Sequence, residues 1–307
     1  LPGARAPETG RDGKLYGIPW TAEALLSASS RFDLVQAAGL PYPDTTDDLV
    51  KVLRAVNKKD RVAGFVADNH YGWTFVPYLH AFGGDVFRKA PDDLFPTLDS
   101  PEAIAAADYY ANLLREFGPD GAVTYTPDQV LQSLKQGRVN FTDQGQLYLA
   151  QLGDAATSRT VKTVKFWLVP KGPAGRFPGT AVHGLGIPAG SKNKEAAKSL
   201  LAHLSTRASA ERMVASSGGY DLPPWEKFQD FKTWEEEGPP KGTLYNYPNR
   251  SNHQIFSIAG APAPPKIARQ IYTQGVHTKM ILRFVQGEPL EKVVAWSENE
   301  LEGFMRG

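Results

Sequence analysis

Apolar side chains recur along the chain at two spacings, one helical and one extended. After Pro43, an apolar residue stands at i, i+3, i+4 and i+7, namely Leu49, Val52, Leu53 and Val56, and this is the spacing of one buried helix face. Asp44 or Thr45 stands where a capping side chain is preferred. The pattern therefore predicts an amphipathic helix that begins just after the cap and ends near Val56.

Similar signals predict further helices. Ser100 and Thr126 each precede a Pro, which combines a capping side chain with the residue favoured at the first helical position. Gly39 and Gly137 stand where helices end. Apolar spacing also predicts helices at residues 21–26, 32–38, 76–81, 268–285 and 289–305, and a helix capped by Ser191 whose core side is Ala197, Leu200, Leu201 and Leu204.

Short apolar, β-rich runs bounded by Gly, Pro or polar residues predict the strands. They lie at residues 15–18, 62–67, 139–142, 164–169 and 180–187, with Pro19 and Pro170 as stops. Because strands alternate with helices along the chain, we expect an α/β protein with mostly parallel sheets.

Polar and aromatic residues follow two of these strands directly. The first set, residues 68–73 (Asp-Asn-His-Tyr-Gly-Trp), lies at the strand end where open α/β sheets bind ligands. The second set is residues 143–148 (Asp-Gln-Gly-Gln-Leu-Tyr). His183 in the middle of an apolar strand, and Asn69 just past one, each need a polar partner.

Composition narrows the class of protein. A chain of 307 residues can form two lobes, each with its own core. Its formal net charge of +1 gives no reason to expect a nucleic-acid or anionic-membrane partner. The absence of cysteine excludes disulfides, thiolate metal sites and Cys nucleophiles. Six Trp and twelve Tyr supply the flat rings on which sugar-binding clefts pack pyranose C–H groups.

Sequence motifs for cofactor, metal or nucleophile chemistry are absent. No Gly-x-Ser-x-Gly elbow, no His-Glu-x-x-His spacing and no nucleotide-binding glycine loop occurs, so we expect no cofactor and no metal. Paired carboxylates, as in glycoside hydrolases, stay open as an alternative, because Asp12, Glu23, Asp68 and Asp143 all lie near predicted strand ends.

Several short motifs in succession resemble one family. They begin with Asp-Gly-Lys-Leu-Tyr-Gly-Ile-Pro-Trp at residues 12–20 and continue at residues 31–40, 43–49, 83–84, 100–103, 136–140 and 187–194. Their order is similar to that of the family 1 extracellular solute-binding proteins of ABC importers, the group that includes the maltose-binding protein. The resemblance runs from Asp12 to the C-terminus.

The resemblance implies a two-lobed, periplasmic-binding-protein-like α/β fold of the class II type, with a hinged cleft. Residues 1–19 and 183–235 would form the N-terminal lobe, and residues 20–182 and 236–307 the C-terminal lobe. Members of the family carry a substantial segment before the Asp-Gly-Lys-Leu-Tyr motif, whereas eleven residues precede Asp12 here. We therefore expect an incomplete N-terminal lobe and a longer protein.

The resemblance also implies a function, that of capturing a carbohydrate or polyol and delivering it to the ABC permease subunits. We expect a monomer in the periplasm, or lipid-anchored outside the cell, whose signal segment is not in this chain. A binding protein for a non-sugar solute such as a polyamine is the other alternative. The cleft residues carried over are Trp20, Glu23, Asn69, His70, Tyr71, Trp73, Gln144, Gln146, Tyr148, His183, Gly184, Gly219, Tyr220, Tyr272 and Gln274.

Overall fold

The structure is a computed structural model of the 307-residue chain. It describes residues 5, 8–10, 12–24, 28–69, 74–144, 149–167, 169–177, 179–217, 221–225, 227–228, 230–233 and 263–306. Among these residues, no helix has both the length and the apolar character needed to cross a bilayer.

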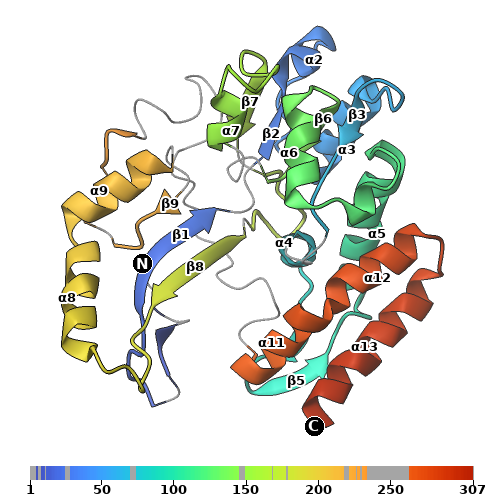
Figure 1. The fold of residues 1–307 in the computed structure, drawn as a ribbon. Helices are drawn as coiled ribbons and strands as arrows, with labels where there is room; N and C mark the ends of the chain where they lie inside the picture. The colour runs from blue at the N-terminus through green and yellow to red at the C-terminus, as the bar shows by residue number, and fades with distance from the viewer. Residues whose placement is uncertain are drawn as a thin grey trace.

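The first lobe is built on a three-stranded antiparallel sheet, in the order β8-β1-β9. Its strands are β1 (Ile18–Ala24), β8 (Thr180–Leu185) and β9 (Asp221–Leu222). Two helices, α8 (Lys194–Leu204) and α9 (Arg207–Ser216), lie beside the sheet (Figure 1). Its small core is made by Ala22, Ala210, Val214, Leu222 and Phe231.

The strand β1 corrects two predictions. Pro19 was expected to stop a strand and residues 21–26 to form a helix, yet the strand runs from Ile18 through Pro19 to Ala24. The β1–β8 register shifts between Pro19 and Thr21, a bulge of the kind that lets a strand tolerate a residue without an N–H donor. Pairing with β8 and β9 on both sides overrides the local helical spacing.

The helix α8 corrects a third prediction. It forms where expected, but with Asn193 rather than Ser191 as cap, and none of its residues is buried. Leu200, predicted to face a core, is 56% exposed. A groove of about 400 Å³ lies along α8 and is lined by Leu201, by Ile18 of β1 and by Leu15, which precedes β1. This side of α8 is therefore not packed tightly against the sheet.

The second lobe is built on a four-stranded sheet in the order β3-β6-β2-β7. Its strands are β2 (Ala28–Arg31), β3 (Ala63–Phe65), β6 (Val139–Thr142) and β7 (Val164–Trp167). A hairpin of β4 (Phe87–Lys89) and β5 (Asp93–Pro96), which the sequence patterns had not indicated, lies to one side.

The expectation of mostly parallel sheets is wrong. Among the named strand pairs of the described residues, only β3–β6 is parallel. Strand β2, where the chain enters this lobe, and strand β7, where it leaves, run antiparallel to their neighbours.

Ten helices of the described chain belong to the second lobe. They are α2 (Phe32–Ala37), α3 (Thr46–Val56), α4 (Phe75–Ala81), α5 (Pro101–Phe117), the 3₁₀ turn η2 (Ala122–Thr124), α6 (Pro127–Lys135), α7 (Leu149–Gly153), α11 (Pro265–Gln274), α12 (Val276–Val285) and α13 (Leu290–Arg306). The predicted caps Thr45, Ser100 and Thr126 are confirmed, since each accepts a backbone N–H of the first turn. The single helix expected at 268–285 is two helices, because Gly275 adopts φ +61° between them.

One large core fills the second lobe between the sheet and the helices α3, α4, α5, α12 and α13. Its largest fully buried side chains include Phe65, Phe75, Tyr110 and Phe141. Phe65 of β3 and Phe141 of β6 stack across the parallel pair, with ring centroids 6.0 Å apart. The packing fixes these two strands, and therefore the residues that follow them.

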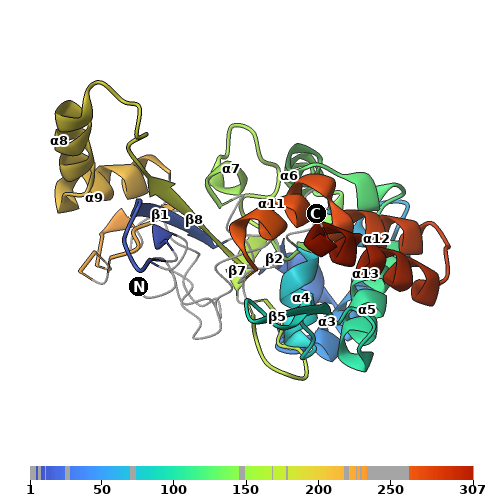
Figure 2. The same cartoon turned by 90° about the horizontal axis from the view of Figure 1, so that it is seen from below.

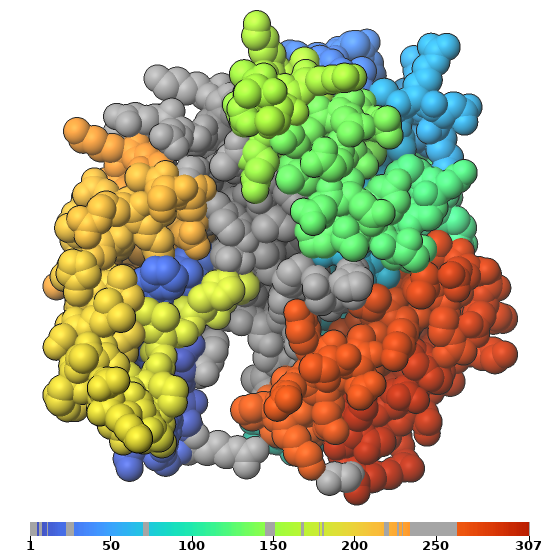
Figure 3. Space-filling view, in the orientation of Figure 1, coloured from blue at the N-terminus to red at the C-terminus, as the bar shows by residue number. Residues whose placement is uncertain are grey.

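The two lobes lie side by side (Figures 1 and 2). The first connection runs between Ala24 of β1 and Ala28 of β2, and the second between Trp167 of β7 and Thr180 of β8. In the space-filling view an opening separates the side of α8 and β8 from α11 (Figure 3). These connections lie within a few residues of the predicted lobe boundaries at 19/20 and 182/183, and the boundaries themselves stay a prediction.

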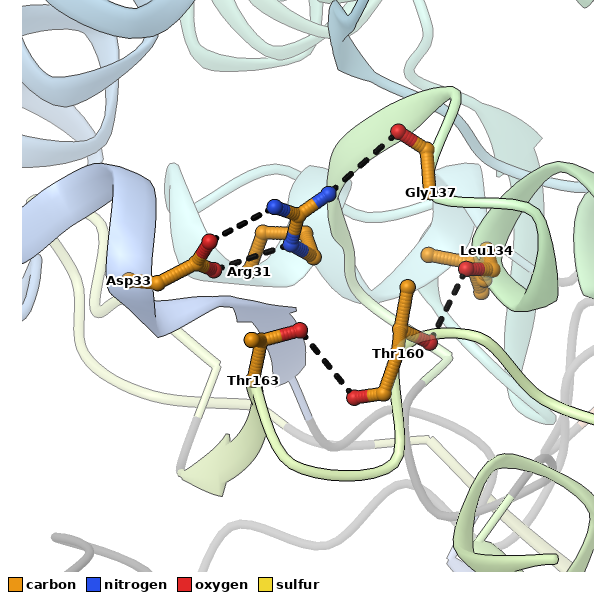
Figure 4. A network of polar contacts seen from close by, with 6 residues as sticks. All are labelled: Arg31, Asp33, Leu134, Gly137, Thr160 and Thr163. Carbon is orange, nitrogen blue, oxygen red and sulfur yellow. Dashed lines mark hydrogen bonds and ion pairs between the residues drawn. The ribbon is translucent and has the colours of Figure 1, made fainter. Parts of the chain in front are cut away.

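A polar network ties three segments of the second lobe together (Figure 4). Arg31 at the end of β2 donates to both carboxylate oxygens of Asp33, at 2.8 and 2.6 Å, and to the carbonyl of Gly137 at 3.4 Å. Thr160 donates to the Leu134 carbonyl at 3.1 Å. Gly137 has φ +69°, and a Cβ there would lie 2.9 Å from the Arg31 guanidinium, so both conformation and space favour glycine.

We predict that Arg31→Ala lowers the free energy of unfolding by about 2 kcal/mol, because it removes a bidentate charged pair from a side chain that is only 18% exposed. The measurement is urea unfolding followed by circular dichroism. The matched control is Lys198→Ala, since Lys198 pairs with Glu195 at 2.8 Å on the exposed face of α8. The control should change the free energy by less than about 0.5 kcal/mol. Equal effects from both variants would contradict the structural role of the network.

Candidate functional site

The C-terminal ends of β3 and β6 form the floor of the candidate site. Because these two strands are parallel neighbours, the residues that follow them emerge at the same edge of the sheet. The backbone N–H of Asp68 donates to Oε1 of Gln144 at 2.9 Å, and the N–H of Gln144 donates to Oγ1 of Thr142 at 3.3 Å. Asp68, Asn69 and Gln144 are all buried. The structure thus brings two of the predicted binding residues, Asn69 and Gln144, together.

Helix α12 closes a third side of this site. The side-chain amide of Asn69 donates to the carbonyl of Thr278 in the first turn of α12, at 3.3 Å. The Oδ1 atom of Asn69 accepts no hydrogen bond from the part of the chain that the structure describes. A buried amide oxygen of this kind is a ready acceptor for a hydroxyl group.

Hydrogen bonds of Thr74 anchor the chain between β3 and α4 to the core of the second lobe. Oγ1 of Thr74 donates to the carbonyl of Asp68 at 2.9 Å and lies 2.6 Å from the hydroxyl of Tyr110 on α5. All three residues are essentially inaccessible to solvent. The two ends of the segment that connects β3 to α4 are therefore anchored to the core.

A buried carboxyl group lies directly beneath the site. Asp143 is 1% exposed, and burial raises its pKa to about 7, with the nearby charge of Asp68 adding to the rise. The Tyr78 hydroxyl is near enough to oppose the rise, but it does not form a well-aligned hydrogen bond with the carboxyl group. Burial also raises the pKa of Tyr78 and Tyr110, and the Asp143 carboxyl contributes to both shifts.

His277 is the second buried titratable group near the site. It lies on α12 with its ring 6.1 Å from that of Phe75, and burial lowers its pKa to about 4. At neutral pH the imidazole is therefore uncharged, so α12 presents no cationic side chain at this position.

The first lobe carries four predicted binding residues on β1 and β8. Trp20 is half-buried beside the β1 bulge, and the backbone of Glu23 pairs with Ala181 of β8 and Asp221 of β9. The C-terminal end of β1 points toward the second lobe (Figure 1). Glu23, one residue from that end, is therefore the member of this group placed nearest to the other lobe.

The remaining pair on β8 is less favourably placed. His183 is exposed and lies opposite Thr21, and Gly184 lies opposite Pro19. The Glu8 carboxylate lies against Gly184 and Gly17, so a Cβ at either position would require this carboxylate to move. Glu8 was not predicted from the sequence, and its carboxylate takes up the space that Gly184 leaves.

The two predicted residues of α11 lie at its C-terminal half. Tyr272 is 38% exposed, and Gln274 is the last residue of the helix and is exposed. Within the described residues, neither forms a hydrogen bond with Asn69 or Gln144. Seven further predictions lie outside the described residues, namely His70, Tyr71, Trp73, Gln146, Tyr148, Gly219 and Tyr220.

The arrangement is suited to holding a polar molecule by hydrogen bonds. Of the four carboxylates considered for hydrolysis, Asp12 lies on an exposed turn, where it accepts from Tyr16 at 3.0 Å. Asp68 and Asp143 are buried at the strand ends. No group of three His, Cys, Asp or Glu side chains within the described ranges could hold a metal ion.

The residues that support the site from below were not predicted. They lie within or beside helices whose apolar spacing is typical of an ordinary core, namely Thr74, Tyr78, Tyr110, His277 and Thr278. A polar side chain on the buried face of a helix was the available signal, because such a group needs a partner.

Comparison with known proteins identifies the family of the chain. Residues 1–211, more than half of the chain, match the family described as bacterial extracellular solute-binding protein. A mannitol-binding protein of Pseudomonas aeruginosa is 25% identical over 221 residues, which are 69% of this chain and 50% of that protein. The matched region therefore spans about half the length of that relative.

Solved structures share the fold over the whole chain. The GacH receptor of Streptomyces glaucescens, studied with acarbose, is 18% identical with a TM-score of 0.78, over 100% of this chain and 75% of that one. Maltose-bound MalE3 of T. maritima is 22% identical with a TM-score of 0.75, over 98% and 75% of the two chains. A solute-binding protein of Agrobacterium vitis with bound D-mannitol is 22% identical with a TM-score of 0.70, over 100% and 76%.

These similarities confirm the predicted two-lobed α/β architecture of periplasmic binding proteins. They also confirm the family suggested by the order of the short motifs. The chain belongs to the bacterial extracellular solute-binding proteins.

Proposed function

We propose that this chain captures a sugar or polyol between its two lobes and presents it to the membrane permease of an ABC importer. The proposal is supported by membership of the family and by relatives described as binding mannitol and maltose. The protein would act as a monomer on the outer side of the cytoplasmic membrane, either in a periplasm or lipid-anchored at the cell surface.

The observation that carries the proposal is the meeting of Asn69 and Gln144 at the ends of two adjacent parallel strands. Amide groups both donate and accept hydrogen bonds, as sugar hydroxyls do, and they carry no charge that would select an ionic solute. The nearby His277 is also uncharged at neutral pH, because burial lowers its pKa to about 4. A neutral polyhydroxylated ligand therefore fits these amides better than an organic phosphate does.

Capture would follow from the two-lobed shape. The second lobe offers the strand-end amides, and the first lobe offers Trp20 within β1 and Glu23 near the C-terminal end of that strand. A ligand that contacts both lobes stabilises the closed arrangement by the contacts made only there. A closed shape is then what a permease could distinguish from the open one.

Isothermal titration calorimetry of the purified protein tests the proposal directly. The probes are D-mannitol, ribitol, maltose and spermidine, each added at neutral pH. We expect binding of at least one of the three neutral probes, and we expect that probe to be recovered chemically unchanged. Binding of spermidine alone would contradict the proposal and indicate a polyamine-binding protein. Consumption of a sugar would replace the binding function by hydrolysis.

We further predict that Asn69→Ala weakens binding of the neutral ligand by about tenfold, equivalent to about 1.4 kcal/mol. Asn57→Ala is the matched control, because both ends of the Asn57 amide are engaged within the fold: it donates to the Glu116 carbonyl at 3.3 Å and accepts from the Gly64 N–H at 3.0 Å. The control should lower the melting temperature and leave the dissociation constant unchanged. Unchanged affinity in Asn69→Ala would remove this residue from the site.

A further inference from the structure

Asp143 occupies a position that connects the core of the second lobe to the floor of the site. It follows β6 directly and precedes Gln144, whose side chain holds the Asp68 amide. Neither oxygen of the Asp143 carboxyl group has a hydrogen-bond partner in the described part of the chain. The hydroxyl of the neighbouring Tyr78 and the side chain of Asn140 on β6 likewise lack partners there. A buried polar group without a partner is costly, and its cost depends on its charge.

The titratable groups that face Asp143 come from three elements. They are Asp68 beyond β3, Tyr78 on α4, and Tyr109 and Tyr110 on α5. His277 on α12 lies across Phe75 from this cluster and is uncharged at neutral pH. None of the described groups that act on the Asp143 carboxyl is a cation. An ionised Asp143 would therefore be desolvated, without a cationic partner among the described groups, and close to Asp68.

Opening the strand ends relieves that unfavourable state. When the contact between the Asp68 N–H and Gln144 Oε1 breaks, the chain around residue 143 can move and admit water to the carboxyl group. Water favours the ionised form, whereas the closed contact favours the neutral form. The position of the strand ends and the charge on Asp143 are thus coupled.

We propose that Asp143 is a positioning residue for the floor of the site, which in its neutral form leaves the Asp68–Gln144 contact closed and in its ionised form drives that contact open. The effect on ligand capture rests on the proposed function, but the effect on the contact does not. Asn69 and Gln144 are in place for a ligand when the contact is closed, so acidic conditions favour the arrangement that binds.

Amide hydrogen exchange at Asp68, followed by NMR between pH 4.5 and 8, measures the contact without any ligand. As the pH rises toward 7, the protection factor of this amide should fall by up to about tenfold per pH unit. Above about pH 7 it should level off, because Asp143 is then ionised in the closed form too. Asp143→Asn keeps the size of the side chain and removes the titration, so its Asp68 protection should not vary with pH.

Two further variants control the measurement. Asp120→Asn changes a carboxylate that is 98% exposed and should leave the pH profile of the wild type intact. Tyr78→Phe removes the hydroxyl that holds the pKa of Asp143 down, so the levelling-off should move to higher pH. This shift tests the proposal independently, even where Asp143→Asn fails to fold.

Two results would overturn the proposal. One is an Asp68 protection factor that does not depend on pH in the wild type, and the other is the same slope in Asp143→Asn as in the wild type. Calorimetry with D-mannitol, ribitol and maltose at pH 5 and pH 7.5 then separates the two claims. A pH-dependent contact in a protein that binds none of these probes would leave the positioning role standing and count against the proposed function.

The global stability offers a second prediction. The pKa of Asp143 is about 7 in the folded state against an ordinary value of 3.8, so the folded state binds more protons between these values. The free energy of unfolding therefore falls as pH rises from about 4 to 7. His277 acts in the opposite sense between about pH 4 and pH 6.5, because its pKa is lowered in the folded state.

Denaturant unfolding of the wild type and of Asp143→Asn isolates the Asp143 contribution as the difference between their free energies of unfolding. That difference should favour the variant increasingly up to pH 7, and a constant difference would contradict the shift.

Discussion

One hydrogen bond determines where the candidate site can form. The Asp68 N–H donates to Gln144 Oε1 across the ends of β3 and β6, and the stacked rings of Phe65 and Phe141 hold these two strands in parallel register below it. A different register would place Asn69 and Gln144 at different heights along the sheet edge. The floor of the site is therefore a consequence of core packing in the second lobe.

Local chemistry made much of the second lobe predictable. Thr45, Ser100 and Thr126 each have a side chain that can cap a helix, and Pro101 and Pro127 suit the first helical position, so the beginnings of α3, α5 and α6 could be read from the sequence. The polar residues after residues 62–67 were predicted to form a site for a similarly local reason, since the strand end determines where they emerge.

What the sequence patterns missed depends on contacts between distant segments. Residues 21–24 show helical spacing, but pairing of β1 with β8 and β9 makes them a strand. Leu200 has the spacing of a core residue, but α8 lies over a groove. The Asp143 environment needs α4 and α5 to deliver Tyr78 and Tyr110. None of these partners is near in sequence, so periodicity could not reveal them.

The central claim is that a neutral polyhydroxylated ligand is held between the strand ends of the second lobe and the β1 end of the first. A crystal structure of the protein grown with D-mannitol, ribitol or maltose at saturating concentration tests it most directly. The account predicts an intact ligand within hydrogen-bond distance of Asn69, with Trp20 or Glu23 of the other lobe also in contact. A ligand bound away from the ends of β3 and β6, or a cleaved sugar at that place, would contradict the account.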